Sequence, residues 1–239
     1  GIPLYLSHTV TSIYGRDRLE RIELTKVDDN RRPIAGSEMY FDVDTLLLSV
    51  GLIPENTLAE EAGIEMDHSI RGPVVDENYM TSVPGIFACG NGLHVHDLAD
   101  FVTKQAGEAA VGAARYYESL KGQLTETKNR NQITADSATS EYEDVALADN
   151  SYCEVHAGNL VGYVVPAKLH KENLPKAVTF YFRVRRPMND ITIEILKGDK
   201  LLRSIHKDVV IPSEMEQVVI AGKHLEETDG DLTIQIKEN

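Results

Sequence analysis

The residues whose types and spacing could do chemistry gather in one short stretch near the middle of the chain. An apolar run, Ile86-Phe87-Ala88-Cys89, leads directly to Gly90 and Asn91. Such a run is typical of a strand buried on both faces, and a small-residue corner at the carboxyl end of a buried strand is where open α/β sheets bind ligands. Asp97 can cap a helix that begins just beyond, and a helix N-terminus attracts anions. The stretch therefore predicts a site for a large, polar, partly anionic cofactor.

The elements that must hold this corner can be read from the apolar pattern around it. Apolar residues recur at helical spacing from Asp97 to Leu120, and we expect this helix to stop near Gly122. Gly107 and the alanines near it predict close packing of the helix against a sheet. A second apolar run, residues 46–50, predicts another buried strand.

Further strands and a short helix are expected before the corner. Residues 4–27 predict two strands around a turn at residues 14–17. Residues 57–62 predict a helical turn that ends at Gly63, and residues 72–76 predict an extended segment. Strands mixed with a long helix indicate that residues 1–124 form a partial α/β, Rossmann-like domain.

The second half of the chain has a different pattern. Residues 125–150 are rich in Thr, Ser, Asn, Asp and Glu, and we predict a linker there. Short extended runs follow, with turn signals such as Met188-Asn189-Asp190 between them, and the cluster of Arg183, Arg185 and Arg186 fits a solvated strand end or a contact with an anion. The predicted strands are residues 160–165, 177–184, 191–196, 201–205, 217–220 and 232–236. This spacing favours an all-β, sandwich-like domain over residues 151–239.

Two motifs resemble those of a known flavoprotein superfamily. Residues 81–91, Thr-Ser-Val-Pro-Gly-Ile-Phe-Ala-Cys-Gly-Asn, are similar to the flavin motif T-x-x-P-G-h-[FY]-A-h-G-D, in which h is apolar. Residues 44–56 resemble a second motif, D-x-h-h-h-x-h-G-x-x-P-[NE]. Both belong to the pyridine nucleotide-disulfide oxidoreductase superfamily, the flavoproteins with two dinucleotide-binding domains. The resemblance covers roughly residues 1–122 and implies FAD and NAD(P) as cofactors.

The resemblance also implies roles for individual residues. In the family the last residue of the flavin motif, an Asp, binds a ribityl hydroxyl of FAD; here it is Asn91, whose amide oxygen can still accept that bond. Gly51 and Gly90 are the matching glycines of the two motifs. The family's following helix points its first amides at the flavin ring, which makes Phe101 and Val102 the candidates here.

His94 and His96 leave several interpretations open. They can be polar residues of a loop, or one of them can lie near the flavin and handle a substrate proton as a weak catalytic candidate. A metal is not expected, because H-x-H lacks further ligands at a defined spacing. Cys89 is expected to be a buried small hydrophobe rather than a redox thiol.

What the sequence lacks narrows its expected function. It contains no C-x-x-C and neither of the family's two G-x-G-x-x-G phosphate loops. By resemblance, residues 1–40 correspond to a hairpin of the nicotinamide domain and residues 41–124 to the C-terminal part of the flavin domain. We therefore expect the C-terminal part of a longer FAD-dependent, NAD(P)-linked oxidoreductase, which by itself is inactive and binds both cofactors weakly. The alternative is a non-catalytic interaction or oligomerisation module with a remnant flavin domain.

Composition sets the remaining expectations. A length of 239 residues suits two domains, and a formal net charge of −14 without a basic stripe argues against nucleic acid and anionic membranes as partners. Two distant cysteines make no disulfide framework, so a cytoplasmic location is expected. The substrate or redox partner is not identified, and we expect the β domain to serve in docking to a partner subunit or in homo-oligomer formation.

Overall fold

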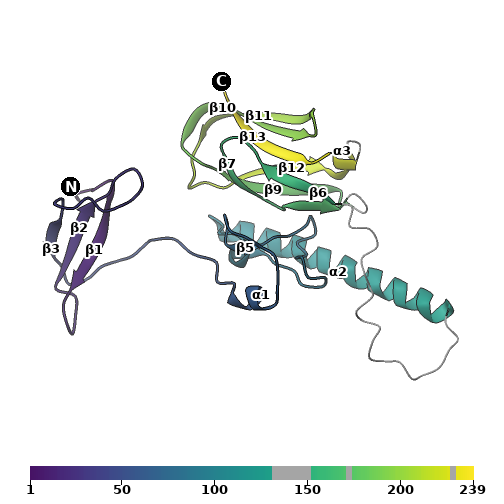
Figure 1. Cartoon of the computed structure of the whole chain (residues 1–239), viewed down its shortest axis with the longest axis horizontal. Helices are drawn as coiled ribbons and strands as arrows, with labels where there is room; N and C mark the ends of the chain where they lie inside the picture. The colour runs from purple at the N-terminus through teal and green to yellow at the C-terminus, as the bar shows by residue number, and fades with distance from the viewer. Residues whose placement is uncertain (131–151, 171–173, 227–229) are drawn as a thin grey trace. The chain divides into compact units, whose positions relative to one another are not determined.

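The computed structural model describes residues 1–130, 152–170, 174–226 and 230–239, which divide into two compact units (Figure 1). The units are residues 1–51 and residues 52–239. Most of the predicted linker, residues 131–150, lies outside the described residues. None of the described helices combines the length and the apolar character that a membrane span requires.

The first unit is a three-stranded antiparallel sheet in the order β1-β2-β3, built from β1 (His8–Tyr14), β2 (Arg21–Lys26) and β3 (Met39–Asp42). The predicted hairpin is confirmed, because β1 pairs with β2 in the register Val10 to Leu24. Thr25 is the one residue of this unit that is buried, and its hydroxyl lies 2.6 Å from that of Thr11.

The prediction of a buried strand at residues 46–50 is wrong in this structure. Leu47 is 91% exposed and Val50 is 85% exposed, and the run forms no strand. A central strand is buried only when other strands pair with both its edges and helices cover its faces. The described residues supply neither paired strands nor covering helices for residues 46–50.

The second unit begins with short elements that lead to one long helix. These are α1 (Thr57–Glu61), β4 (Met66–Asp67), β5 (Gly72–Pro73), the 3₁₀ turn η1 (Gly90–Gly92) and α2 (Ala99–Arg130). The helical turn predicted before Gly63 is confirmed. The helix α2 starts two residues later than predicted and continues through Gly122 to Arg130. Gly122 has free space around it, and an interior glycine costs a helix only about 1 kcal/mol, so it does not end α2.

The rest of the second unit is strand-rich. Two sheets, in the orders β11-β10-β13-β6-β8 and β12-β9-β7, contribute to one apolar core (Figure 1). The elements are β6 (Tyr152–Ala157), β7 (Val161–Val165), β8 (Lys168–His170), β9 (Ala177–Val184), β10 (Met188–Lys197), β11 (Lys200–Val210), β12 (Glu216–Ala221), α3 (Gly222–Glu226) and β13 (Leu232–Glu238). Pairing is antiparallel except between β13 and β6, which run parallel.

All six strands predicted in this region are present, and β6, β8 and α3 are additional. The turn predicted at residues 188–190 is wrong, because these residues open β10. Asp190 does adopt a positive φ of 49°, a conformation that Asp tolerates better than most residues. A residue typical of turns therefore lies inside a strand here.

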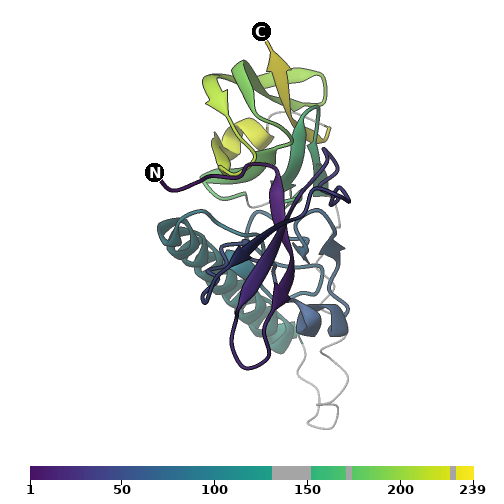
Figure 2. The ribbon, with the colours of Figure 1, turned by 90° about the vertical axis from the view of Figure 1, so that its left-hand side faces the viewer.

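The helix α2 lies along one side of the two sheets, below them in Figure 2. We predicted close packing of α2 at Gly107, but nothing lies within 4 Å of a Cβ placed there, so this prediction is wrong. The closest approach of α2 is at Gly112, where a Cβ would come 2.2 Å from the carbonyl oxygen of Asn78. One turn earlier Ala109 is buried in a small second core with Leu93 and with Val165 of β7. This second core joins residues 64–112 to the β domain.

Candidate functional site

The predicted corner is present, but the apolar run before it is not a buried strand. Residues 86–89 form only one isolated bridge, from Phe87 to Met80, and Cys89 is exposed rather than buried. The corner itself is tight, since Gly90 has a φ of +65° and a Cβ there would lie 3.2 Å from Cγ1 of Val102. Glycine is the residue that adopts this conformation without strain. The run lacks strand neighbours among the described residues, whereas the corner is held by the helix that follows.

Gln105 of α2 organises the corner from inside. Its side chain is completely buried, and its Oε1 accepts the N–H of Gly90 at 2.6 Å. That bond fixes the orientation of the amide, because only an oxygen can accept it. Nε2 of Gln105 must then donate to Nε2 of His94 at 2.8 Å, and Nε2 of His96 must donate to Oε1 of Gln105 at 3.0 Å. The sequence offered no sign of this role, since Gln105 occupies a core position of an amphipathic helix.

The two histidines form a buried pair instead of an exposed loop. His94 is 1% exposed and His96 is 8% exposed, and their ring centroids lie 4.4 Å apart. Burial, with His96 and Arg183 nearby, lowers the pKa of His94 to about 3. His94 is therefore neutral near pH 7, with its proton on Nδ1, because Nε2 accepts from Gln105. Nδ1 of each ring is buried without a hydrogen-bond partner.

The β domain closes over this pair. The rings of Tyr163 and Tyr181 meet the ring of His94 edge-on, at centroid distances of 6.1 and 5.6 Å. Arg183 of β9 donates to the carbonyl oxygen of Val95 at 3.1 Å and to Oδ1 of Asp97 at 2.5 Å. The interpretation of Arg183 as a solvated strand end is thus wrong. It is partly buried and fixes the segment between the histidines and α2.

A pocket of about 250 Å³ opens beside His94. Its walls come from the segment after Gly51, from the turn around Arg71, from the histidine segment and from β7 and β9: Leu52, Ile53, Pro54, Ser69, Ile70, Arg71, His94, Val95, Tyr163 and Arg183. Asn56 joins two of these walls, because its Nδ2 donates to the carbonyl oxygens of Arg71 and Gly92 at 2.7 Å each. Asn56 ends the first motif and Gly92 follows the second, so the two motifs meet in space.

The residues predicted to bind a cofactor are only partly brought together. Asn91 is exposed on the corner, and its Oδ1 accepts the N–H of His96 at 3.1 Å. Val102 packs on Gly90, while the N–H of Phe101 already donates to the carbonyl oxygen of Leu98 at 3.2 Å. Gly51 has a φ of +87° and is the last residue of the first unit.

These residues fit one side of a flavin. Asn91 is exposed, and a carbonyl oxygen that accepts one N–H retains a second lone pair for a hydroxyl. The first residues of α2 are exposed, as an anion-facing helix N-terminus requires. The neighbouring pocket of about 250 Å³ is smaller than the roughly 300–1,000 Å³ of typical ligand sites, and none of Asn91, Phe101 and Val102 lines it.

Comparison with known proteins identifies a family that the first half of the chain matches. A sequence model of the family described as pyridine nucleotide-disulphide oxidoreductase matches residues 1–115. The chain is 31% identical over 121 residues to the ferredoxin reductase component of chlorobenzene dioxygenase from Cupriavidus sp. (strain PS12), covering 48% of this chain and 26% of that protein.

Two further relatives are reductases as well. The ferredoxin–NAD(+) reductase subunit of the benzene 1,2-dioxygenase system of Pseudomonas putida is 37% identical over 91 residues, 38% of this chain and 19% of that protein. Thioredoxin reductase of Listeria monocytogenes is 36% identical over 93 residues, 38% of this chain and 28% of that protein. Each match thus spans between a fifth and a little over a quarter of the relative's length. Residues 1–115 thus match the pyridine nucleotide-disulfide oxidoreductase superfamily, whose cofactors are FAD and NAD(P).

Proposed function

We propose that the chain supplies one wall of the flavin site in an FAD-dependent, NAD(P)-linked oxidoreductase. The observation that carries this proposal is the pair of hydrogen bonds from Asn56 to the carbonyl oxygens of Arg71 and Gly92. They hold the end of the first motif against Gly92, directly after the corner of the second. The pocket beside them is lined by residues 52–54 of the first motif and by residues 94–95, which follow the corner.

Each residue of the wall has a task that follows from its environment. Gly90 lets the chain turn closely past α2, so that the exposed amide of Asn91 can bind a ribityl hydroxyl. The N-terminus of α2 stabilises negative charge at the ring edge by about 0.3–1 kcal/mol from its dipole. When bound, the flavin exchanges a hydride with the nicotinamide.

His94 and His96 are better suited to positioning than to proton transfer. A pKa of about 3 keeps His94 unprotonated near neutral pH, so it is a poor acid there. Its ring instead forms part of the pocket wall, and the hydrogen bonds of both rings to Gln105 fix the shape of the corner. This wall presents no phosphate loop, so the pyrophosphate must be bound elsewhere.

The test uses two flavins that differ in their phosphates. Quenching of flavin fluorescence is measured while the purified chain is added to riboflavin or to FAD. Because the wall contacts only the ring and the ribityl chain, we expect weak binding of similar strength for both. Asn56→Ala and Asn91→Leu should weaken both at least about tenfold, the loss of a well-placed hydrogen bond.

The control is Asn189→Leu, which changes an exposed asparagine of β10 in the β domain and should leave binding unchanged. Circular dichroism establishes that each variant is folded. Absence of quenching by either flavin at saturating protein would overturn the assignment of the corner. Stoichiometric FAD binding far tighter than riboflavin binding would show that the chain holds the phosphates, against the one-wall proposal.

A further inference from the structure

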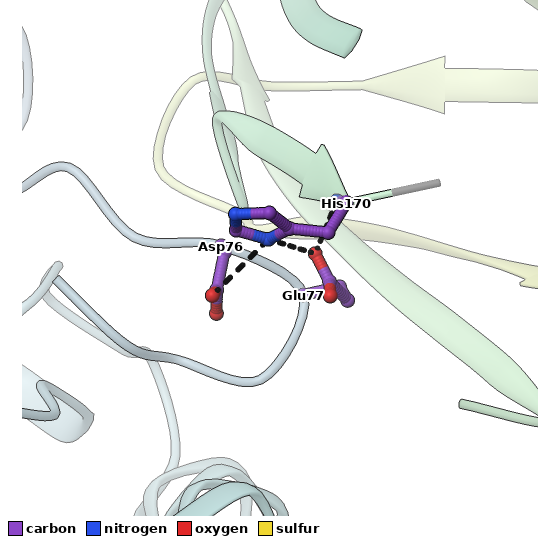
Figure 3. Close-up of side chains that lie close together, drawn as sticks. All are labelled: Asp76, Glu77 and His170. Carbon is purple, nitrogen blue, oxygen red and sulfur yellow. Dashed lines mark hydrogen bonds and ion pairs between the residues drawn. The ribbon is translucent and has the colours of Figure 1, made fainter. Parts of the chain in front are cut away.

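A second group of chemically capable side chains lies away from the corner, where residues 74–80 meet strand β8. Asp76, Glu77 and His170 each offer one ligand atom, and the three atoms lie within 4.8 Å of one another (Figure 3). Asp76 is 5% exposed and Glu77 is 7% exposed, while the side chain of His170 is 33% exposed. Among the residues that the structure describes, no other trio of His, Cys, Asp or Glu is grouped in this way.

The spacing within this trio is unlike that of a hydrogen-bonded ion pair. Nδ1 of His170 lies 3.4 Å from Oδ2 of Asp76 and 3.5 Å from Oε2 of Glu77. Charged N–H···O bonds measure about 2.7–2.9 Å, so both contacts are too long. Two ligands of a tetrahedral ion with bonds of about 2.1 Å are separated by about 3.4 Å. The two distances from Nδ1 of His170 match the separation of neighbouring ligands in a metal site.

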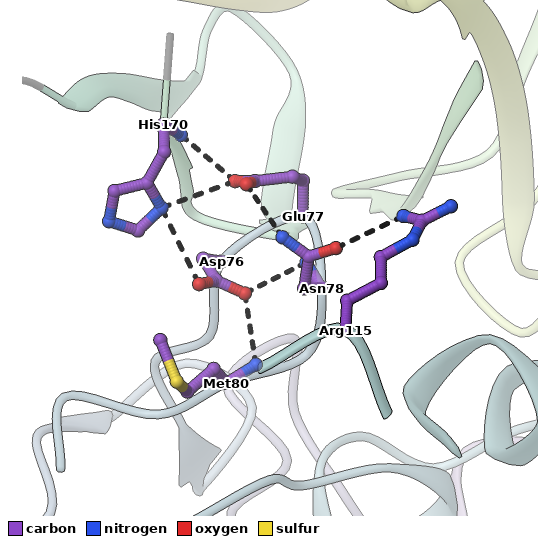
Figure 4. A network of polar contacts seen from close by, with 6 residues as sticks. All are labelled: Asp76, Glu77, Asn78, Met80, Arg115 and His170. Carbon is purple, nitrogen blue, oxygen red and sulfur yellow. Dashed lines mark hydrogen bonds and ion pairs between the residues drawn. The ribbon is translucent and has the colours of Figure 1, made fainter. Parts of the chain in front are cut away.

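Both carboxylates are held in place through their other oxygen. Oδ1 of Asp76 accepts the N–H groups of Asn78 and Met80 at 2.8 and 2.9 Å (Figure 4). Oε1 of Glu77 accepts Nδ2 of Asn78 at 2.8 Å. Such outer contacts orient ligands in known metal sites, and here they turn Oδ2 and Oε2 toward the same ring nitrogen.

Apart from His170, the cationic side chains described near the two buried carboxylates are engaged with other groups. Lys168 pairs with Glu65 at 2.6 Å, and Arg115 reaches only the side-chain oxygen of Asn78, at 3.5 Å (Figure 4). If His170 gives up its proton to serve as a ligand, the two carboxylates carry a charge of −2, which a divalent cation would balance.

We propose that Asp76, Glu77 and His170 bind one divalent transition-metal ion of the zinc class. Two carboxylate oxygens and an imidazole nitrogen are ligands that Zn²⁺ accepts, and nitrogen disfavours Mg²⁺ and Ca²⁺. The partial exposure of His170 leaves a fourth position for water. No metal was expected from the sequence, since H-x-H lacks further ligands at a defined spacing. No spacing motif connects Glu77 with His170, which follows it by 93 residues.

The ion has a structural task at this place. The N–H of His170 donates to Oε2 of Glu77 at 2.9 Å, and the N–H of Ala167 donates to the carbonyl oxygen of Val75 at 3.0 Å. Residues 75–77 are thus already joined to the strand segment at residues 167–170. A metal ligated from both sides strengthens this junction between the α/β part of the second unit and its β domain. The proposal is independent of flavin binding.

The experiment is a Zn²⁺ titration of the full chain, without a polyhistidine tag, in competition with a chromophoric chelator. We expect one ion per chain, no competition by Mg²⁺, and visible absorption of the Co²⁺ form typical of four ligands. Glu77→Gln and His170→Gln should each weaken binding at least about tenfold. Zn²⁺ should also slow amide hydrogen exchange at residues 75–80 and 167–170.

His206→Gln is the matched control. His206 also has two acidic neighbours, but Asp190 faces its Nδ1 and Asp208 its Nε2, so the two carboxylates cannot share one ion with a single ring nitrogen. This variant should bind Zn²⁺ as the unchanged chain does. Less than a tenth of an equivalent of bound metal, or equal affinity in Glu77→Gln and His170→Gln, would overturn the proposal and leave the trio as an ion pair.

Discussion

Replacing Gln105 by leucine tests the corner most directly. Leu has a similar size but neither donates nor accepts a hydrogen bond, so the change removes three contacts at once. The N–H of Gly90 and the Nε2 atoms of His94 and His96 would be left in a site where Gln105 itself is completely buried. No backbone is disturbed, because Gln105 lies inside α2.

The expected cost follows from the number of buried groups that lose a partner. An unsatisfied buried group costs about 1–3 kcal/mol, so three such groups would cost about 3–9 kcal/mol if the effects added. The free-energy costs of neighbouring groups are not additive, and the burial of a leucine side chain recovers some transfer free energy. We therefore expect the free energy of unfolding to fall by about 3 kcal/mol, the lower end of this range. Gln105→Glu should cost less than Gln105→Leu, since a carboxylate can still accept from the N–H of Gly90 and from Nε2 of His96.

The measurement is urea unfolding together with amide hydrogen exchange at residues 88–106, which reports on this corner separately from the first unit. Thr103→Ala is the control, because Thr103 is exposed on the same helix, and it should change the free energy of unfolding by no more than about 0.5 kcal/mol. A Gln105→Leu variant whose stability and exchange rates match those of the control would refute the reasoning that Gln105 holds the corner together.

Three further predictions concern the same unit. Gly107→Ala should stabilise the chain by about 0.5–1 kcal/mol in thermal unfolding, while Gly112→Ala should destabilise it, because its Cβ would meet a backbone oxygen at 2.2 Å; equal effects would contradict the packing of α2. Arg183→Met should cost about 1–3 kcal/mol and speed amide exchange at residues 93–98, since it removes hydrogen bonds to Val95 and Asp97; unchanged exchange would argue against this anchor. The lowered pKa of His94 means that its stabilising contribution is complete above pH 6.5 and is lost as the pH falls toward 3. From pH 7 to 5 the chain should lose about 2 kcal/mol more than His94→Asn does, because the slope rises toward about 1.4 kcal/mol per unit below pH 6.5, and identical urea midpoints for both proteins at pH 5 and 7 would contradict this.

The parts of the fold that depend on local pattern were predictable. The hairpin of β1 and β2, the turn of α1 before Gly63 and six strands of the β domain lie where periodicity and turn residues indicated. The errors occurred where the outcome depends on distant neighbours. Residues 47–50 and Cys89 belong to apolar runs and yet are exposed, because burial requires partner strands that no local pattern guarantees.

The candidate site divides in the same way. The sequence identified Gly90, Asn91, His94 and His96 as one group, since a corner and the residues after it are close by connectivity alone. It could not identify Asn56 and Gln105, because an asparagine in a loop and a glutamine on a helix have no distinctive local signal. Their roles appear only when the chain brings residues far apart in sequence to hydrogen-bond distance.

By itself, the sequence indicated the superfamily that residues 1–115 match, the cofactors of that superfamily and the tight turn at Gly90. These depend on side-chain type and on φ preference, which are properties of short segments. The tertiary structure alone decided which apolar runs are buried, that Arg183 and two tyrosines of the β domain enclose the histidines, and that Asp76, Glu77 and His170 converge. The physical reason is that burial, pKa and metal-ligand geometry are set by the neighbours that surround a residue in space, and the spacing of residues along the chain does not fix those neighbours.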